Sequence, residues 1–349
     1  MKHWRISVVV ASLLVACTSA PTVADLSQQT EMRGFIKEMV QRHGFDRAQL
    51  ETWFKQAQVR ADIIEAISRP AESKPWYQYR PIFLQPARIE GGAEFWDQHA
   101  KVLQQAEQTY GVPPQIITAI LGVETRYGIH QGTYRMMDSL VTLAFNYPPR
   151  AAFFRDELEQ YLLLTREEGI DPLAMTGSYA GAMGQAQFIS SSYRHYAVDF
   201  DGDGKRDLWT NAADAIGSVA NYFKEQGWER GGTVAVPAVV SGDRVQALLD
   251  KGLKPTLKAA DMKRQGVSTD AALPHNALVS LIELEQQTGP EYWLGLQNFY
   301  VITRYNRSPL YAMAVYQLSE EIRALHNERL AHGAQSGRSS PSVWRRRSR

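Results

Sequence analysis

Glu124 is the residue whose type and position point most directly to chemistry. It lies in a predicted helix over 114–127 that begins after prolines and is followed by a glycine, the usual asymmetry of helix boundaries. Glu124 follows Ile117 by seven residues and Ile120 by four, so the three side chains share one face. Desolvation on an apolar face raises the pKa of a carboxyl group, and a protonated glutamic acid can act as a general acid. The spacing equally allows an ion pair, for example with Arg126.

A second group of candidate ligands lies in the segment 199–207. It follows the opening of an EF-hand loop, with aspartates at positions 1, 3 and 5, glycine at position 6 and a backbone carbonyl at position 7. Position 12 is Thr210 rather than glutamate, so an aspartate early in the following helix is the candidate that closes the shell. The expected Ca²⁺ ligands are Asp199, Asp201, Asp203, Lys205 through its carbonyl, and Asp214. The ion would be structural; a metal-free Asp/Gly-rich turn is the alternative.

The segment 177–188 combines small residues with hydrogen-bonding and aromatic side chains. Ser178 and Gln187 offer hydrogen bonds, while Tyr179 and Phe188 offer flat apolar faces. A polysaccharide requires this mixture, because sugar rings present both C–H faces and hydroxyl groups. A tight turn before a buried helix would give the same pattern.

Composition and charge describe an ordinary globular protein that does not bind polyanions. The chain has 349 residues, of which 44% are hydrophobic and 21% charged. The formal net charge is +1, but two basic residues lie in the leader and five arginines lie after His332, which leaves about −6 for residues 17–332. Nucleic acid is therefore not an expected partner.

The N-terminus has the pattern of an export signal. A basic start and an apolar run too short to span a bilayer lead to Cys17, the only cysteine in the chain, so no intramolecular disulfide is possible. Residues 14–17 resemble a lipobox, which predicts a signal peptide at 1–16, lipidation of Cys17 and a tether over 17–30. A signal peptide without lipidation is the alternative. Thr18 rather than aspartate after the cysteine is typical of the outer membrane.

Most of the remaining chain has helical periodicity. A strand is expected at 233–240, at a sheet edge because it contains Pro237, within a small α+β insertion at 229–275. The last residues, 333–349, are expected to be disordered. Helices are expected at about 31–43, 46–58, 92–110, 114–127, 135–145, 150–168, 185–198, 211–226, 276–288 and 309–332.

Four motifs together resemble the membrane-bound lytic murein transglycosylase B family of Gram-negative bacteria. They are the residues 122–128 around Glu124, the segments 177–188 and 199–207, and the stretch 298–306. The resemblance covers about 31–332. It implies a mainly α (α+β) fold, in which a lysozyme-like helical core with an EF-hand-like calcium loop is flanked by a helical domain and a small α/β insertion. The expected regions are 31–110 (N-terminal helical), 111–228 (lysozyme-like core), 229–275 (small α/β), 276–332 (C-terminal groove and helices) and 333–349 (disordered basic tail).

The resemblance also implies an activity and its residues. The family cleaves the β-1,4 bond between N-acetylmuramic acid and N-acetylglucosamine of peptidoglycan strands and forms 1,6-anhydromuramic acid, without an organic cofactor. Its catalytic glutamate corresponds to Glu124, acting as acid and then as base, in a periplasmic enzyme lipid-anchored to the outer membrane. Its substrate-groove positions correspond to Ser178, Gln187, Phe188, Tyr222, Tyr305 and Asn306, and further to Tyr79, Arg150 and Tyr311.

No second carboxylate stands out beside Glu124. Ordinary glycosidases use two carboxylates, so a single acid favours ring closure on the substrate over hydrolysis. A hydrolytic muramidase on the same fold remains an alternative. A peptidoglycan-binding lipoprotein without catalytic activity is the other, although a pure binding protein has no need of a desolvated acid.

Overall fold

The computed structural model describes residues 30–69, 74–242 and 244–336. The chain divides into two compact units, Met1–Val59 and Arg60–Arg349. The division therefore does not fall at the predicted boundary after residue 110, since the helices on either side of 110 pack together in the second unit. The predicted signal peptide, Cys17 and nearly all of the tether lie outside the described residues. Among the helices in the described ranges, none is both long and apolar enough to cross a membrane.

The first unit is a pair of helices. Helices α1 (Thr30–His43) and α2 (Arg47–Gln56) agree with the predicted ones. Asp46 caps α2, because its carboxylate accepts a hydrogen bond of 2.7 Å from the backbone N–H of Gln49. Apolar side chains at helical spacing are buried, among them Ile36 on α1 and Phe54 on α2.

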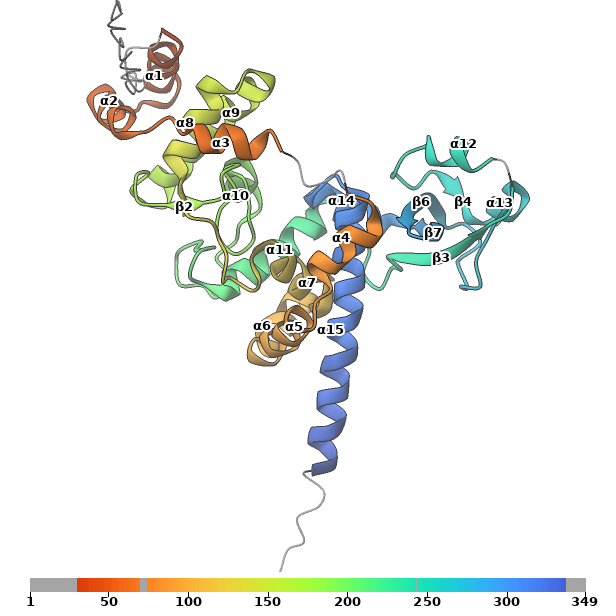
Figure 1. Cartoon of the computed structure of the whole chain (residues 1–349). Helices are drawn as coiled ribbons and strands as arrows, with labels where there is room; N and C mark the ends of the chain where they lie inside the picture. Colours follow the sequence, from red (N-terminus) through yellow and green to blue (C-terminus); the bar gives the residue numbers. More distant parts are fainter. Residues whose placement is uncertain (1–29, 70–73, 243, 337–349) are drawn as a thin grey trace, which may run out of the picture. The chain divides into compact units, whose positions relative to one another are not determined.

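The second unit is mainly helical (Figure 1). Helix α7, which carries Glu124, packs against α5, α6, α11 and the long C-terminal helix α15, so it lies at the centre of the helical part. A short two-stranded ribbon joins β1 (Tyr134–Arg135) to β2 (Thr176–Gly177). The helices are α3 (Ala61–Ile67), α4 (Trp76–Phe83), α5 (Pro86–Gln98), α6 (Ala100–Tyr110), α7 (Pro114–Thr125), α8 (Met136–Asn146), α9 (Ala151–Glu167), α10 (Ser190–Tyr196), α11 (Ala212–Glu225), α14 (Gln297–Tyr305) and α15 (Pro309–Ser336).

Two predicted helices are shorter or broken. The predicted helix over 92–110 is interrupted at His99, whose backbone (φ −112°, ψ 21°) is not helical. The break lets each part bury its own apolar face, with Phe95 on α5 and Leu103 on α6. The predicted helix over 185–198 forms only as α10, because Met183 and Phe188 exchange two backbone hydrogen bonds of 2.9 and 3.1 Å that hold this stretch as a tight loop.

The prediction of a helix over 276–288 is wrong, because this segment is a strand. Strand β6 (Leu278–Gln286) forms a hairpin with β7 (Gly289–Gly295), and the glutamates 283 and 285 alternate with buried Leu284. The run 279–282 is buried throughout, so the sequence does not show the alternation of apolar and polar residues that indicates a strand. The small α/β region therefore extends to residue 295 rather than 275.

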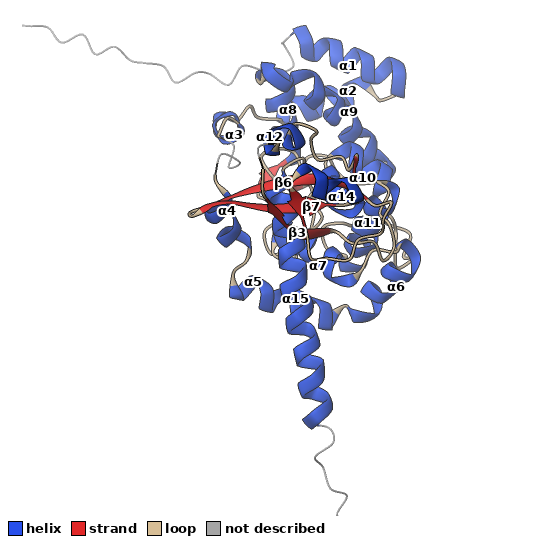
Figure 2. Cartoon of the chain, turned by 90° about the vertical axis from the view of Figure 1, so that its right-hand side faces the viewer, coloured by secondary structure: helices blue, strands red, loops and turns tan. Residues whose placement is uncertain are grey.

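This sheet has five antiparallel strands in the order β4-β6-β7-β3-β5 (Figure 2, red). Strand β3 (Ala235–Val240) confirms the predicted strand, but it lies between β7 and β5 rather than at the edge. Pro237 is tolerated because β5 (Val267–Ser268) pairs only with residues 239 and 240, so β3 at Pro237 pairs with β7 alone. The other elements here are α12 (Val245–Leu249), β4 (Leu257–Lys258) and α13 (Ala259–Met262).

The end of the described chain is helical. Helix α15 continues to Ser336 and so enters the segment 333–349 that the composition predicts to be disordered. The rest of that segment lies outside the described residues.

Candidate active site

Glu124 lies on the last turn of α7, next to a tyrosine from α15. The hydroxyl of Tyr311 donates a hydrogen bond of 2.5 Å to Oε1 of Glu124. Protein atoms crowd the carboxyl group, and this desolvation raises the pKa of Glu124 to about 7, although the hydrogen bond from Tyr311 acts in the opposite direction. A carboxyl group with this pKa is present in both protonation states at neutral pH, so it can donate a proton and later accept one.

The ion pair that the sequence allowed does not form. Arg126 is exposed, and no described cation forms a salt bridge with Glu124. Within the described ranges, burial and Tyr311 alone account for the shifted pKa of Glu124, and no second carboxylate contributes to it. Asp138 instead forms an ion pair of 2.7 Å with Arg135.

The backbone after Glu124 is held in an unusual conformation. Arg126 (φ 50°) and Tyr127 (φ 61°) are left-handed, and the only other described non-glycine residue with positive φ is Gln187 (φ 49°), a predicted groove residue. Thr125 connects the two segments, because its hydroxyl lies 3.0 Å from the carbonyl oxygen of Gln185 and accepts a 2.9 Å hydrogen bond from the N–H of Gly128. Backbone outliers of this kind persist where the surrounding contacts impose them, and they cluster at functional sites.

The reversed turn after α7 folds Tyr127 back onto its own helix. Its hydroxyl donates a hydrogen bond of 2.6 Å to the carbonyl of Arg88 on α5. A Cβ atom at Gly122 would lie 2.6 Å from this hydroxyl, so only glycine fits there. Tyr127 thus joins the end of α7 to α5 and fixes the helix turn that carries Glu124.

A cleft of about 740 Å³ contains most of the predicted groove residues. The sequence did not single out four further large side chains in its wall: Phe153, Phe154, Arg304 and Arg307. The two arginines flank the predicted pair Tyr305–Asn306, and this proximity in the sequence was the signal available. The predicted residues that line the cleft are Arg150, Gln187, Phe188, Tyr222, Tyr305 and Asn306.

Three aromatic rings form a fixed surface in this cleft. The ring centroids of Phe188, Tyr222 and Tyr305 lie 5.0–5.8 Å apart. The hydroxyl of Tyr222 donates to the carbonyl of Arg304 at 2.5 Å, and that of Tyr305 donates to the carbonyl of Ala186. Burial and the nearby charge of Glu124 both raise the pKa of Tyr305, which shows that the aromatic surface adjoins the acid.

The three other predicted groove residues lie outside the lining of the cleft. Tyr311 contacts Glu124 as described, and the charge of Tyr79 contributes to the raised pKa of Tyr311, which places Tyr79 near it. The hydroxyl oxygen of Ser178 accepts a 3.0 Å hydrogen bond from the N–H of Ala182, a residue of the cleft wall. Ser178 therefore shapes the loop.

The predicted calcium loop brings three carboxylates together. Ligand oxygens of Asp199, Asp201 and Asp203 lie within 4.8 Å of one another. Gly202 (φ 80°) and Gly204 (φ 90°) supply the left-handed backbone that the tight loop requires. Hard oxygen donors converging in this way fit Ca²⁺, so the donor set suits the expected ion.

Asp214, the residue expected to close the shell, holds the backbone of the loop. It is fully buried, and its two carboxylate oxygens accept hydrogen bonds of 2.8 Å from the N–H groups of Phe200 and Asp207. It therefore clamps the two ends of the loop, and it is not among the carboxylates that converge within 4.8 Å. Coordination by Asp214 stays a prediction.

Comparisons with known proteins agree with this geometry. The family described as "Transglycosylase SLT domain" matches residues 27–320. Membrane-bound lytic murein transglycosylase B of Escherichia coli (strain K12) is 44% identical over 308 residues, which cover 85% of this chain and 84% of that protein.

Solved structures are also similar over most of the chain. Catenated lytic transglycosylase SltB1 of Pseudomonas aeruginosa has a TM-score of 0.83 and 49% identity, covering 86% of this chain and 100% of that one. Lytic transglycosylase Slt35 of Escherichia coli in complex with calcium has a TM-score of 0.80 and 43% identity, covering 86% and 95%. SltB3 of Pseudomonas aeruginosa in complex with NAG-anhNAM-pentapeptide has a TM-score of 0.75 and 32% identity, covering 84% and 79%. With its acid, aromatic cleft and fold in place, the chain belongs to the family of proteins with the transglycosylase SLT domain.

Proposed function

We propose that this chain is a lytic transglycosylase that cleaves the β-1,4 bond between N-acetylmuramic acid and N-acetylglucosamine of peptidoglycan and leaves a 1,6-anhydromuramic acid end. The observation that carries the proposal is the environment of Glu124, a carboxyl group with a pKa of about 7 beside an aromatic cleft and without a described carboxylate partner. The related SltB3 structure holds a NAG-anhNAM-pentapeptide, which is an anhydro product of this kind.

In the proposed mechanism Glu124 acts first as an acid. Its proton passes to the glycosidic oxygen as the bond to C1 of the muramic acid breaks. The acetamido group of the same sugar stabilises the positive charge on C1, which replaces the second carboxylate of ordinary glycosidases. The ionised Glu124 then takes the proton of the C6 hydroxyl, and that oxygen bonds to C1.

Tyr311 holds the reacting carboxyl group in place. Its hydroxyl donates to Oε1, so Oε2 is the oxygen left to exchange the proton. Burial and the neighbouring charge of Glu124 raise the pKa of Tyr311 well above its usual value, so the tyrosine stays a hydrogen-bond donor through both steps.

The test is product analysis with Glu124→Gln. Glutamine keeps the shape but cannot donate the proton, so we expect the variant to release no muropeptides from purified sacculi, while Glu90→Gln, at an exposed site, retains full activity. Mass spectrometry of wild-type products should show saccharide ends that lack one water. Saturated, hydrated ends would instead establish a hydrolytic muramidase, and binding of glycan without turnover by the wild type would establish a non-catalytic binding protein.

A calcium ion at Asp199, Asp201, Asp203 and the carbonyl of Lys205 is the second part of the proposal. The ion would neutralise three neighbouring carboxylates and so stabilise the loop before α11. The structure of related Slt35 in complex with calcium supports this assignment. No catalytic step requires the ion.

The cellular location is the third part. The lipobox-like residues 14–17 and the similarity to a relative named as membrane-bound support a chain that is lipidated at Cys17 and faces the periplasm from the outer membrane. Mass spectrometry of the N-terminal peptide from a bacterial host should find acylated Cys17, and an unmodified N-terminus after a different cleavage would contradict it.

A further inference from the structure

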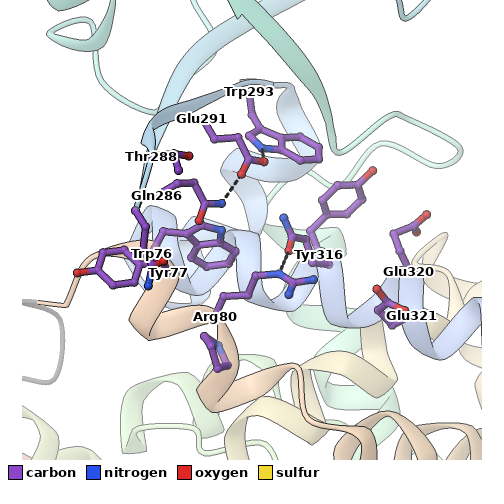
Figure 3. Close-up of a pocket in the computed structure, with 13 residues that line it drawn as sticks. Trp76, Tyr77, Arg80, Gln286, Thr288, Glu291, Trp293, Tyr316, Glu320 and Glu321 are labelled. Atoms are coloured by element: carbon purple, nitrogen blue, oxygen red, sulfur yellow. Dashed lines mark hydrogen bonds between the residues drawn. The ribbon is translucent and has the colours of Figure 1, made fainter.

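A second cleft lies between α4, the tip of the β6–β7 hairpin and α15 (Figure 3). Its volume is about 800 Å³. It shares no lining residue with the 740 Å³ cleft around Phe188, Tyr222 and Tyr305, which we call the catalytic cleft. Nothing in the proposed mechanism uses it.

Aromatic side chains from three elements line this second cleft. They are Trp76 and Tyr77 of α4, Trp293 of β7 and Tyr316 of α15. Trp293 and Tyr316 pack edge to face at 6.2 Å, and the indole N–H of Trp293 donates a 2.6 Å hydrogen bond to Glu291. These rings are therefore held in position while they line an open space.

The cleft also contains hydrogen-bond donors that lack acceptors. Trp76 is fully buried, yet its indole N–H has no partner among the described residues. Arg80 donates through Nε to Gln317 at 2.7 Å, and its other guanidinium N–H groups have no acceptor in the described part of the chain. A buried donor without an acceptor is costly, so the indole N–H of Trp76 calls for an acceptor on a ligand, and half-buried Arg80 offers further donors in the same cleft.

Carboxylates in the same wall restrict what that ligand can be. Glu291 accepts from both Trp293 and Gln286, which holds its charge inside the cleft, and Glu320 and Glu321 lie at the α15 side. Arg323 pairs with Glu320, which leaves Glu291 and Glu321 against the one arginine of the cleft, and this balance disfavours an anionic ligand. The ligand that fits is therefore one with neutral amide groups and with apolar faces that can stack on the aromatic side chains.

We propose that this second cleft binds an N-acetylated amino sugar of a glycan strand, apart from the catalytic cleft. The C–H face of the ring stacks on the partly exposed aromatic side chains of Tyr77, Trp293 and Tyr316, and the acetamido carbonyl accepts from Trp76 and Arg80. The identity of the ligand rests on the proposed function, since peptidoglycan is the polymer that the catalytic cleft acts on. A strand held at a second place raises the local concentration of wall polymer around the catalytic cleft.

Calorimetry with chitotetraose tests this site directly in the full chain carrying Glu124→Gln. We expect two binding events per chain, one at each cleft. Tyr77→Ala and Arg80→Ala should each abolish the event at the second cleft or weaken it by about tenfold. Trp76→Phe keeps an aromatic ring but removes the indole N–H together with the five-membered ring, so it should weaken the same event. Arg244→Ala and Tyr300→Ala, an exposed arginine and a half-buried tyrosine elsewhere, are the matched controls.

Activity separates this proposal from the proposed function. With Glu124 intact, Tyr77→Ala and Arg80→Ala should raise the KM for insoluble sacculi and leave turnover of a soluble muropeptide tetrasaccharide unchanged. A single binding event in the parent protein, or two that all three variants preserve, would overturn the second site. Displacement of chitotetraose from it by a glycan-free stem peptide would also overturn it, in favour of a peptide site. Absence of turnover by the wild type would overturn the proposed function alone.

Discussion

Replacing Tyr311 with phenylalanine tests the assignment of Glu124 most sharply. The substitution removes the 2.5 Å hydrogen bond to Oε1 and leaves the ring packed between α15 and α7. This hydrogen bond lowers the pKa of Glu124 against the effect of burial, so its loss raises that pKa above about 7. A hydrogen bond to a charged group contributes about 1.5–3 kcal/mol, which corresponds to a rise of about one to two pKa units.

The direction of the effect on activity follows from the first step. Free enzyme must hold Glu124 protonated to donate the proton, so kcat/KM falls as the pH rises through its pKa. In Tyr311→Phe the alkaline limb of the pH–rate profile should therefore move to higher pH by at least about one unit, while kcat falls because the carboxyl group is less well oriented.

The assay is release of anhydromuropeptides from sacculi between pH 4 and 10, with a carboxyl-selective NMR titration of Glu124 as the direct readout. Tyr161→Phe is the matched control, because its buried hydroxyl donates a 2.7 Å hydrogen bond to the carbonyl of Pro172, away from Glu124. It should lose stability without moving the limb. An alkaline limb that stays in place, or moves to lower pH, in Tyr311→Phe would refute the reasoning.

Three further predictions concern stability. The folded protein keeps Glu124 protonated above the usual pKa of 4.5, so Glu124 lowers the free energy of unfolding as the pH rises from 4.5 to about 7, by up to about 3 kcal/mol. Glu124→Gln should therefore raise Tm at pH 8 and leave it nearly unchanged at pH 4. Equal gains in Tm at both pH values would contradict this. Asp203→Asn removes one charge of the proposed calcium site, so the increase in Tm on adding calcium to chelator-treated protein should shrink; an increase as large as that of the wild type would show that the ion binds elsewhere. Gly122→Ala places a Cβ 2.6 Å from the Tyr127 hydroxyl and should cost about 1–3 kcal/mol in chemical unfolding, whereas Gly34→Ala, where no atom lies within 4 Å, should not destabilise the protein.

The acid and its environment could be predicted because they depend on local spacing. The positions of Ile117, Ile120 and Glu124 on one helix face already place the carboxyl group against apolar surroundings. Its partner could not be found in this way, because Tyr311 lies 187 residues away on another helix. Only packing of α15 against α7 brings the two together, and a periodic pattern carries no information about such contacts.

The β6–β7 hairpin shows where periodicity fails. Four consecutive buried residues at 279–282 obscure the alternation that continues through Glu283, Leu284 and Glu285. The strand is buried on both faces over its first half, and short apolar runs of this kind fit a buried helix equally well. The broken helix at His99 likewise depends on which faces α5 and α6 bury, which is a tertiary property.

The clamp that Asp214 makes has a consequence for how the calcium loop would fill. One buried side chain ties the N–H groups of Phe200 and Asp207 at opposite ends of the loop, and these two hydrogen bonds help to hold the curved backbone. Part of the ordering of the loop therefore comes from these protein contacts, unlike in small zinc domains, where the ion itself drives folding. The entropy of that part of the ordering is lost when the chain folds, which lowers the entropic cost of binding an ion. In this protein Asp214 would therefore raise calcium affinity through preorganisation of the loop.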